Sequence, residues 1–428
     1  MSQPGVEQKP KGISARITDE DIERARRQIG IPQHERNAVF NTVATTDTIS
    51  HFAFGIGDDN PLFHDPDYGK ASRWRGQIAT PLYLTTTGVD ETPHPTPELK
   101  QLFRGLFSGV GKYYSGTSWE WFRPVCPDDL VYRQYSTYDV QVKDNSAFTG
   151  GRTVIDKYEY LYADRLGVPF AHRIDSFVNA ERGASFEKGQ LRNVKRQTFT
   201  PDDIAKIDAM YENEKRRGRE KRYWEDVAVG ESVDSIVKGP LSVTDIVGFH
   251  IGWGFGQFYG AGPLKFAYKH RKRMRAFYVE DPYGFPDVAQ RLHWDPARAQ
   301  DLGLPAPYDY GTMRSNWLAH LLTNWIGDDG WLWKLDVEMR GFNFLGDVTI
   351  CSGEIVAKRR EGLHCVLDLA VRGTNQRGEV TCPGTATVIL PSREDGPVIL
   401  PSASDVIARR AAAMIARGAD QLREPRPA

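Results

Sequence analysis

The chain has 428 residues, enough for two or three domains, and its 40% hydrophobic and 26% charged residues are typical of a soluble globular protein. Its 55 basic and 56 acidic residues nearly cancel, which argues against nucleic acid, an anionic membrane or another polyanion as the main partner. The N-terminal residues lack the apolar core of a signal peptide, and no apolar run reaches the length of a membrane span. Four scattered cysteines without a C-x-x-C pair indicate buried free thiols, so we expect a cytoplasmic protein.

The first half opens with "TTDTISHFAFGIGD", in which apolar residues recur at helical spacing behind a Thr/Asp cap. This pattern predicts a short amphipathic helix that ends at Gly57. The polar segment "GDDNPLFHDPDYG" follows, and then "ATPLYLTTT", a Pro-containing turn that leads to a predicted helix. Alternating apolar and polar residues from Pro127 onward predict antiparallel strands.

The second half repeats this order. "SVTDIVGFHIGWG" carries the same cap and the same spacing, and "HWDPARA" matches "FHDPDYG" so that Asp65 and Pro66 correspond to Asp295 and Pro296. "PAPYDYGTMRSNWLAHLLTNWIG" then predicts a turn and a long helix with one apolar stripe. Strands are predicted from "LGDVTICSGEIVAKRR" onward. The sequence therefore predicts a duplicated fold, helix then sheet in each half.

The remaining segments set the expected boundaries. We expect an N-terminal unit at 15–185, a C-terminal unit at 226–395 with an insertion at 254–286, and a helix and tail at 396–428. Residues 186–225 are rich in charge and poor in apolar side chains, which is typical of a surface connector. Within that connector, a helix capped by Thr200 is predicted from Pro201 to Arg217.

Two motifs carry a family resemblance. "GDDNPLFHDPDYG" resembles the motif G-D-x-N-P-L-H-x-D-P-x-x-A of MaoC-like, (R)-specific enoyl-CoA hydratases, and "GLPAPYDYG" resembles their later G-F-x-x-P-I-x-H-G. The order of the segments is similar to acyl dehydratases with a degenerate, fatty-acid-synthase-like N-terminal dehydratase domain. The resemblance implies an α+β double hotdog, with two antiparallel sheets that each wrap around a long central helix. It also implies hydration of 2-enoyl-CoA, or dehydration of 3-hydroxyacyl-CoA, with a long or bulky acyl group and no cofactor besides the coenzyme A thioester.

In the first half the motif is incomplete. Asp58 and Asn60 are in register, but the position of the family's catalytic His holds Phe63, and His64 stands one place further on. Thr85 occupies the position of the family's Gly. We therefore expect Asp58 and Asn60 to be turn and cap residues, and these two together with His64 to be remnants of the motif.

In the second half His293 matches the motif His, and Gly311 follows it at the family's spacing. The acid position falls on Val288, with Asp287 beside it. Hydration of a 2-enoyl thioester needs a group that moves a proton and a donor that holds the charge developing on the thioester oxygen. We expect His293 to move the proton, with Asp287 as its weaker partner. The backbone N–H of Gly311, at the start of a helix, is the expected donor.

Supporting roles are predicted for residues around this motif. Asp295 matches the aspartate of the family motif and is expected to contact substrate. Asp309 and Tyr310 directly precede Gly311. They either contact substrate as well or are a turn acid and a packing aromatic residue. The insertion contributes a basic run with Lys269, Arg271 and Arg273. This run indicates either a solvated helix face or a surface that neutralises the phosphates of coenzyme A.

Two other functions stay open at this level. The missing acid at position 288 is compatible with a non-catalytic acyl-CoA-binding protein or a heteromeric partner, and the hotdog fold also supports thioesterases. The crowded acidic residues around His64 lack a recognisable ligand spacing, so no metal is expected. Pairing with a second copy, or with another hotdog protein, is left open.

Overall fold

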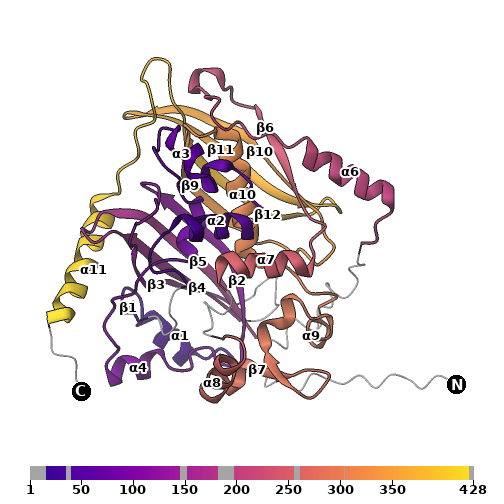
Figure 1. Cartoon of the computed structure of the whole chain (residues 1–428). Coiled ribbons are helices and arrows are strands. Elements are labelled where there is room, and N and C mark those ends of the chain that lie inside the picture. The colour runs from indigo at the N-terminus through magenta and orange to yellow at the C-terminus, as the bar shows by residue number, and fades with distance from the viewer. Residues whose placement is uncertain are drawn as a thin grey trace.

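The computed structural model describes residues 16–34, 40–144, 152–181, 197–254, 261–302 and 304–423. One ten-stranded antiparallel sheet runs through it in the order β1-β3-β4-β5-β2-β9-β12-β11-β10-β6 (Figure 1). The strands of the first half are β1 (Pro32–Gln33), β2 (Gly111–Trp121), β3 (Tyr132–Lys143), β4 (Thr153–Ala163) and β5 (Pro169–Ala180). Those of the second half are β6 (Ser232–Lys238), β9 (Trp331–Glu338), β10 (Thr349–Glu361), β11 (His364–Asn375) and β12 (Val380–Ile389).

The two halves of the sheet meet where β2 pairs with β9, with Trp119 opposite Leu335. The two predicted sheets are thus one continuous sheet, because these two strands share a ladder of backbone hydrogen bonds. In the second half the sheet wraps around the long helix α10 (Gly311–Ile326), whose Leu318, Leu321 and Leu322 are fully buried. This arrangement confirms the α+β double hotdog.

The central helix of the first half differs from the prediction. At the corresponding position there is only the short 3-10 helix η2 (Pro81–Thr85), and the chain then continues as Thr86, Thr87 and Gly88. β-Branched residues lower helix propensity, and Gly88 has a φ of 125°, which an α-helix cannot contain. The expectation of a long helix in each half is therefore wrong for the first half, and its concave face is left without one.

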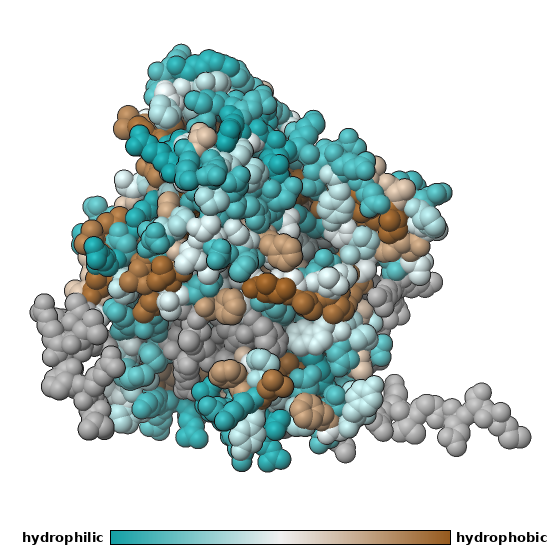
Figure 2. All heavy atoms as spheres, viewed as in Figure 1, coloured by the Kyte–Doolittle hydropathy of each residue, from teal (hydrophilic) through white to brown (hydrophobic). Residues whose placement is uncertain are grey.

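The predicted pair of short helices is confirmed. α2 (Thr46–Gly55) and α7 (Val243–Trp253) each begin with a capping box, formed by Thr45 with Thr48 and by Ser242 with Asp245. The helices pack against each other closely, since a Cβ atom on Gly55 would lie 2.8 Å from the carbonyl oxygen of Gly248. Hydrophobic side chains gather on the face where α2 and α7 lie (Figure 2), and Phe54, Val247 and Ile251 are each more than half exposed.

The other helices are peripheral. They are α1 (Asp19–Arg26), α3 (Pro66–Lys70), α4 (Pro97–Phe103), α6 (Pro201–Glu212), α8 (Lys265–Arg273), α9 (Pro296–Asp301) and α11 (Asp405–Arg423). The 3-10 helices η1 (Pro61–Phe63), η3 (Trp224–Asp226), η4 (Arg275–Phe277) and η5 (Ala289–His293) and the hairpin β7 (Tyr278–Glu280) with β8 (Pro286–Val288) complete the described elements. The connector helix α6 ends at Glu212 rather than Arg217, and Ile207 packs it against β6. Among the helices of the described ranges, none is both long and apolar enough to cross a membrane.

Candidate functional site

His293 lies at the end of η5, with its ring held by the turn that precedes α10. Its Nδ1 atom is 2.8 Å from the carbonyl oxygen of Tyr308. A carbonyl oxygen only accepts hydrogen bonds, so Nδ1 carries the proton and Nε2 keeps its lone pair. Burial lowers the pKa of His293 from 6.5 to about 4. The side chain is therefore a neutral imidazole at pH 7, ready to accept a proton at Nε2.

Tyr310 connects this histidine to two further polar side chains. Its ring stacks on His293, with 3.8 Å between the ring centroids. Its hydroxyl oxygen accepts a hydrogen bond of 2.6 Å from Nε2 of Gln290 and lies 3.1 Å from Nε2 of His250. Burial lowers the pKa of His250 to about 4 as well, so this ring is also neutral. The structure thus brings His293, Tyr310, Gln290 and His250 together, with α7, η5 and the start of α10 each contributing side chains.

Gly311 begins α10, so its N–H has no acceptor within the helix. A Cβ atom at this position would lie only 2.5 Å from Cδ1 of Tyr114, a residue of β2 in the first half. Glycine is therefore required here by the close approach of Tyr114. The donor position that the sequence predicted is present, and the first half of the chain forms one of its walls.

Asp309 is fully buried and forms an ion pair with Arg314, with 2.9 Å between Oδ2 and Nε. Asn343 donates a hydrogen bond to the same carboxylate oxygen, and Arg314 also donates to the carbonyl oxygens of Gly341 and Thr381. Burial nevertheless raises the pKa of Asp309 to about 6. These contacts fix the turn that carries Tyr308, Tyr310 and Gly311, so Asp309 positions the site through its neighbours.

The structure does not bring the predicted partner Asp287 to His293. Asp287 lies in β8, where its carboxylate accepts a hydrogen bond from the N–H of Val288 and its carbonyl oxygen accepts one from Arg291. Within the described residues, no hydrogen bond or ion pair joins Asp287 to His293. Asp295 caps α9, since its carboxylate accepts from the N–H of Ala297 and from Nε of Arg291. These bonds give Asp295 a structural role.

The basic insertion forms the exposed helix α8. Lys269 and Arg273 are exposed, and Arg271 is half-buried with its guanidinium 5.9 Å from the ring centroid of Phe285. None of these three lines the cavity described below that contains His293. They are therefore not part of the cavity that contains His293.

The motif of the first half consists of turn and cap residues, as predicted. Asp58 accepts a hydrogen bond from the N–H of Asn60, and Asn60 caps η1 by accepting one from Leu62. His64 has its Nε2 atom 2.6 Å from the carbonyl oxygen of Asp58. Phe63, at the position of the motif His, is buried in an apolar cluster with Leu62 and Ile78.

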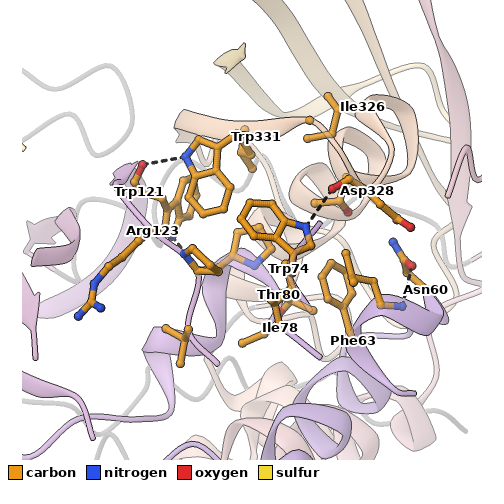
Figure 3. A pocket seen from close by; sticks show the side chains of 18 of the residues that line it. Asn60, Phe63, Trp74, Ile78, Thr80, Trp121, Arg123, Ile326, Asp328 and Trp331 are labelled. Atoms are coloured by element: carbon orange, nitrogen blue, oxygen red, sulfur yellow. Dashed lines mark hydrogen bonds between the residues drawn. The ribbon is translucent and has the colours of Figure 1, made fainter. Parts of the chain in front are cut away.

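The space next to this motif is small and apolar. A cavity of about 50 Å³ lies between Asn60, Phe63 and the end of α10. Figure 3 shows the indoles of Trp74 and Trp331 facing each other in this cavity, and the Nε1 atom of Trp74 donates to the carbonyl oxygen of Asp328. Tryptophan rings line this small cavity, and Phe63 stands where the motif has its histidine.

Asp58, Asp59 and His320 have ligand atoms within 4.8 Å of one another, a spacing compatible with a metal ion. Nζ of Lys238, however, lies 2.8 Å from Nδ1 of His320. A lysine ammonium donates to Nδ1, which leaves the proton of the neutral imidazole on Nε2, the atom that faces Asp58 at 3.6 Å. The positive charge of Lys238 and this protonated Nε2 disfavour a cation here, so the residues present do not fit a metal.

A large cavity of about 1850 Å³ extends from His293 along the first half of the sheet. His293, Tyr310, Gly311 and Thr312 line it on the side of α10. Its lining includes residues of the concave face, such as Tyr135, and residues of the outer face, such as Ile174, so the space extends around the end of the sheet. Among the residues that the structure describes, no long helix of the first half occupies the space next to the candidate site.

Three members of the site were not predicted from the sequence. His250 has the helical spacing of a core residue, Gln290 lies in the second motif, and Tyr114 belongs to a strand of the other half. The matched motifs could have identified Gln290, because it occupies the position that Asn60 has in the first half. Nothing local in the sequence relates Tyr114 to Gly311, since only the pairing of β2 with β9 brings them together.

Comparisons with known proteins agree with this architecture. Residues 28–172 match a family model described as the FAS1-like dehydratase domain region. A solved structure described as a MaoC-like dehydratase aligns with a TM-score of 0.55 and 15% identity, over 85% of this chain and 99% of its own. The family model matches within the first half of the chain, and the alignment supports the double-hotdog fold.

Two further solved structures are similar at lower scores. A MaoC-like dehydratase from Phytophthora capsici has a TM-score of 0.47 and 12% identity, covering 86% of this chain and 98% of its own. A protein from Mycobacterium tuberculosis whose description names a double hotdog fold has a TM-score of 0.43 and 10% identity, covering 83% and 96%. No curated protein matches the chain.

Proposed function

We propose that this protein is an acyl-CoA hydratase/dehydratase, because residues 28–172 match a model of the FAS1-like dehydratase domain region and the chain shares the fold of a MaoC-like dehydratase. It interconverts a 2-enoyl-CoA and a 3-hydroxyacyl-CoA through the site around His293. The observation that carries the proposal is the neutral, Nδ1-protonated His293 at the turn that presents Gly311. A proton acceptor and a helix-start donor in one cavity are the two groups that this reaction needs.

The proposed steps use these groups in order. Nε2 of His293 takes a proton from water, whose oxygen forms a bond to the β-carbon of the enoyl group. The π-electrons of the double bond move to the thioester, and the N–H of Gly311 stabilises the charge on its oxygen. The imidazolium then returns the proton to the α-carbon, which restores the neutral histidine and gives the 3-hydroxyacyl thioester. The reverse sequence removes water.

In this proposal Tyr310 takes over the positioning that the family's acid would provide. Its stacked ring holds the plane of His293, and its bonds with Gln290 and His250 hold the phenol in place. Asp287 has no part, because its carboxylate is engaged within β8. The exposed Lys269 and Arg273, with Arg271 beside them, are proposed to neutralise the phosphates of coenzyme A.

The large cavity supports the proposal of a bulky acyl group. Only the part of it on the concave face adjoins His293, and that part is bordered by Tyr114 and Tyr310. Coenzyme A thioester is the substrate, and the proposal includes no other cofactor. The acyl group would lie on the concave face that lacks a long helix.

The test is to incubate the protein with crotonyl-CoA and with longer and bulkier 2-enoyl-CoAs. Loss of enoyl absorbance without release of free thiol supports the proposal, whereas free thiol identifies a thioesterase, and binding without turnover identifies an acyl-CoA-binding partner. His293→Ala should lower kcat by about 10²-fold or more, since a positioned acid-base group contributes this much. His51→Ala, on the exposed face of α2, is the matched control and should keep full activity. Equal rates for the two variants would refute the site assignment.

A further inference from the structure

One row of paired residues crosses eight strands of the sheet. Tyr135 of β3 lies opposite Tyr160 of β4, which lies opposite Arg173 of β5, which in turn faces Trp119 of β2. The row continues into the second half as Leu335, Ala386, Leu369 and Ile355. Directly paired residues point to the same face of a sheet, so all eight side chains share the concave face.

The two ends of this row differ in chemistry. The second half presents aliphatic side chains, and α10 covers them. The first half presents two tyrosines, a tryptophan and an arginine, and no described long helix covers them. Trp119, Arg173 and Tyr160 are buried within the protein, whereas Tyr135 is half-buried and lines the large cavity. An aliphatic face suits a helix with an apolar stripe, whereas this aromatic and charged face suits an occupant with rings and polar atoms.

The neighbouring rows of the first half repeat this character. Tyr158, Asp175 and Thr117 form the next row, and Asp156, Phe177 and Tyr114 form the one after it. Tyr114, Tyr135, Tyr158 and Phe177 are half-buried and line the large cavity, and we call these four the ring cluster. Its members meet edge to face, since the ring centroid of Phe177 lies 5.4 Å from that of Tyr114 and 5.8 Å from that of Tyr158.

Buried charges lie beneath the ring cluster. Arg173 and Asp175 form an ion pair in which Nε of Arg173 is 2.8 Å from Oδ1 of Asp175, and both side chains are at most 5% exposed. The Tyr114 hydroxyl donates to the same carboxylate at 3.4 Å. This buried pair fixes the orientation of the Tyr114 ring through its hydroxyl.

A second charged pair lies at the edge of the ring cluster. Nζ of Lys112 is 3.0 Å from both the Asp156 carboxylate and the Tyr158 hydroxyl. The same ammonium lies 4.5 Å from the ring centroid of Tyr158 and 4.6 Å from that of Phe177. Cation–π contacts and hydrogen bonds therefore fix these two rings in place.

The ring cluster is adjacent to the reacting centre. The Tyr114 side chain contacts Gly311 at one end of its ring and Asp175 at its hydroxyl. A thioester whose oxygen is held by the N–H of Gly311 would place its acyl group within reach of Tyr114 and then of Phe177. The Tyr114 side chain thus connects Gly311, whose N–H is the proposed donor, to the ring cluster of the first half.

We infer that the ring cluster selects an acyl group that carries an aromatic or other unsaturated ring, and disfavours a straight saturated chain. This inference rests on the proposed function and specifies its substrate class. Rings gain edge-to-face contacts with Tyr114, Tyr158 and Phe177 that a methylene chain cannot make.

Binding of unreactive thioesters tests this selection without requiring turnover. Titration calorimetry would compare 3-phenylpropanoyl-CoA with nonanoyl-CoA, which have equal numbers of acyl carbons. We expect the ring-bearing thioester to bind at least about tenfold more tightly, which is the effect of one to two ring pairs. Equal binding, or tighter binding of nonanoyl-CoA, would overturn the inference.

Phe177→Leu removes one ring and keeps an apolar side chain of similar size. It should weaken binding of 3-phenylpropanoyl-CoA by about fivefold to tenfold and leave nonanoyl-CoA within about twofold. Tyr283→Leu, at a residue 93% exposed on the β7–β8 hairpin, is the control and should change neither. An equal loss for both ligands in Phe177→Leu would also refute selection by rings.

Turnover distinguishes this inference from the proposed function. The parent enzyme is offered 3-hydroxy-3-phenylpropanoyl-CoA and 3-hydroxynonanoyl-CoA, and formation of the enoyl product is followed. Dehydration of the first with the higher kcat/KM supports both proposals, and preference for the second overturns the ring selection alone. If neither is dehydrated while the binding preference holds, the proposed reaction fails and the ring-selective site stands.

Discussion

The Nδ1 atom of His293 lies 2.8 Å from the carbonyl oxygen of Tyr308, and this one contact determines which ring nitrogen can accept a proton. The carbonyl belongs to the turn that leads into Gly311, so the same few residues orient the acid-base group and the donor of the proposed reaction. The motif of the second half, which lacks the family's acid, therefore places His293 next to the turn before Gly311 in the candidate site. The motif of the first half matches the family at more positions, but its Asp58 and Asn60 are turn and cap residues.

The first prediction concerns pH. Burial lowers the pKa of His293 to about 4, and an imidazole accepts a proton only above its pKa. The acid limb of kcat/KM for hydration should therefore fall near pH 4 rather than near 6.5. Rates measured with an enoyl-CoA from pH 3.5 to pH 8, with folding followed in parallel by circular dichroism, would check this. A limb near pH 6.5 in folded protein would show that His293 is not the group that titrates.

Gly311→Ala should lower kcat by about a hundredfold, because the new Cβ clashes with Tyr114 and moves the N–H away from the thioester oxygen. The substitution leaves the N–H itself in place. Gly311→Ala combined with Tyr114→Ala should recover part of the loss, and Tyr114→Ala alone gives the baseline for the cycle. If the losses of kcat in Gly311→Ala and Tyr114→Ala simply add in the double variant, a clash between the two side chains is not the cause of the loss.

Tyr310→Phe keeps the ring stacked on His293 and removes the hydroxyl. Gln290 and His250 lose their partner on the phenol, so we expect kcat to fall about tenfold and the free energy of unfolding to fall by about 1–3 kcal/mol. Urea unfolding and steady-state kinetics measure the two effects separately. Because the proposed role is positioning, a shift in the pH profile should accompany the loss of kcat, and a loss of stability alone would point to a purely structural hydroxyl.

Asp309→Asn should destabilise the protein by about 3–5 kcal/mol, because it leaves the buried guanidinium of Arg314 without its charged partner. The double variant Asp309→Leu with Arg314→Met should recover much of this loss, since it removes both charges. Midpoints of urea unfolding provide the comparison. Equal stability of Asp309→Asn and the parent would show that the ion pair between Asp309 and Arg314 does not stabilise the turn.

Phe63→His restores the motif histidine of the first half but should not restore a site. The residue is 2% exposed in an apolar cluster, so an imidazole there should reduce stability by about 1–3 kcal/mol. In a His293→Ala background the change should give no activity above that of His293→Ala alone, because Thr85 replaces the glycine and tryptophans line the small cavity there. Recovery of hydration would mean that the first half retains a usable site.

The sequence was informative where the local pattern matched the local structure. The caps at Thr45 and Ser242 and the stripe of α10 form where the pattern predicts, because capping and amphipathicity depend on residues a few positions apart. Asp295, predicted to contact substrate, instead caps α9. The same reasoning assigned Asp58 and Asn60 to a turn and cap. It failed for the first central helix, where a Pro-containing start was read as a long helix although threonines and Gly88 follow.

By itself, the sequence predicted a duplicated fold and showed that the first motif is incomplete, because both follow from residue types at short, fixed spacings. The family resemblance added the double hotdog and the expectation that the chemistry lies at His293 and Gly311. Only the tertiary structure decided which side chains surround that histidine. The position of Asp287 next to Val288 in the sequence could not show that its carboxylate bonds to the N–H of Val288 within β8. No local pattern relates Tyr310 to His250, or Tyr114 to Gly311. Those contacts join distant parts of the chain, and they form because β2 pairs with β9 and α7 packs beside the turn before α10.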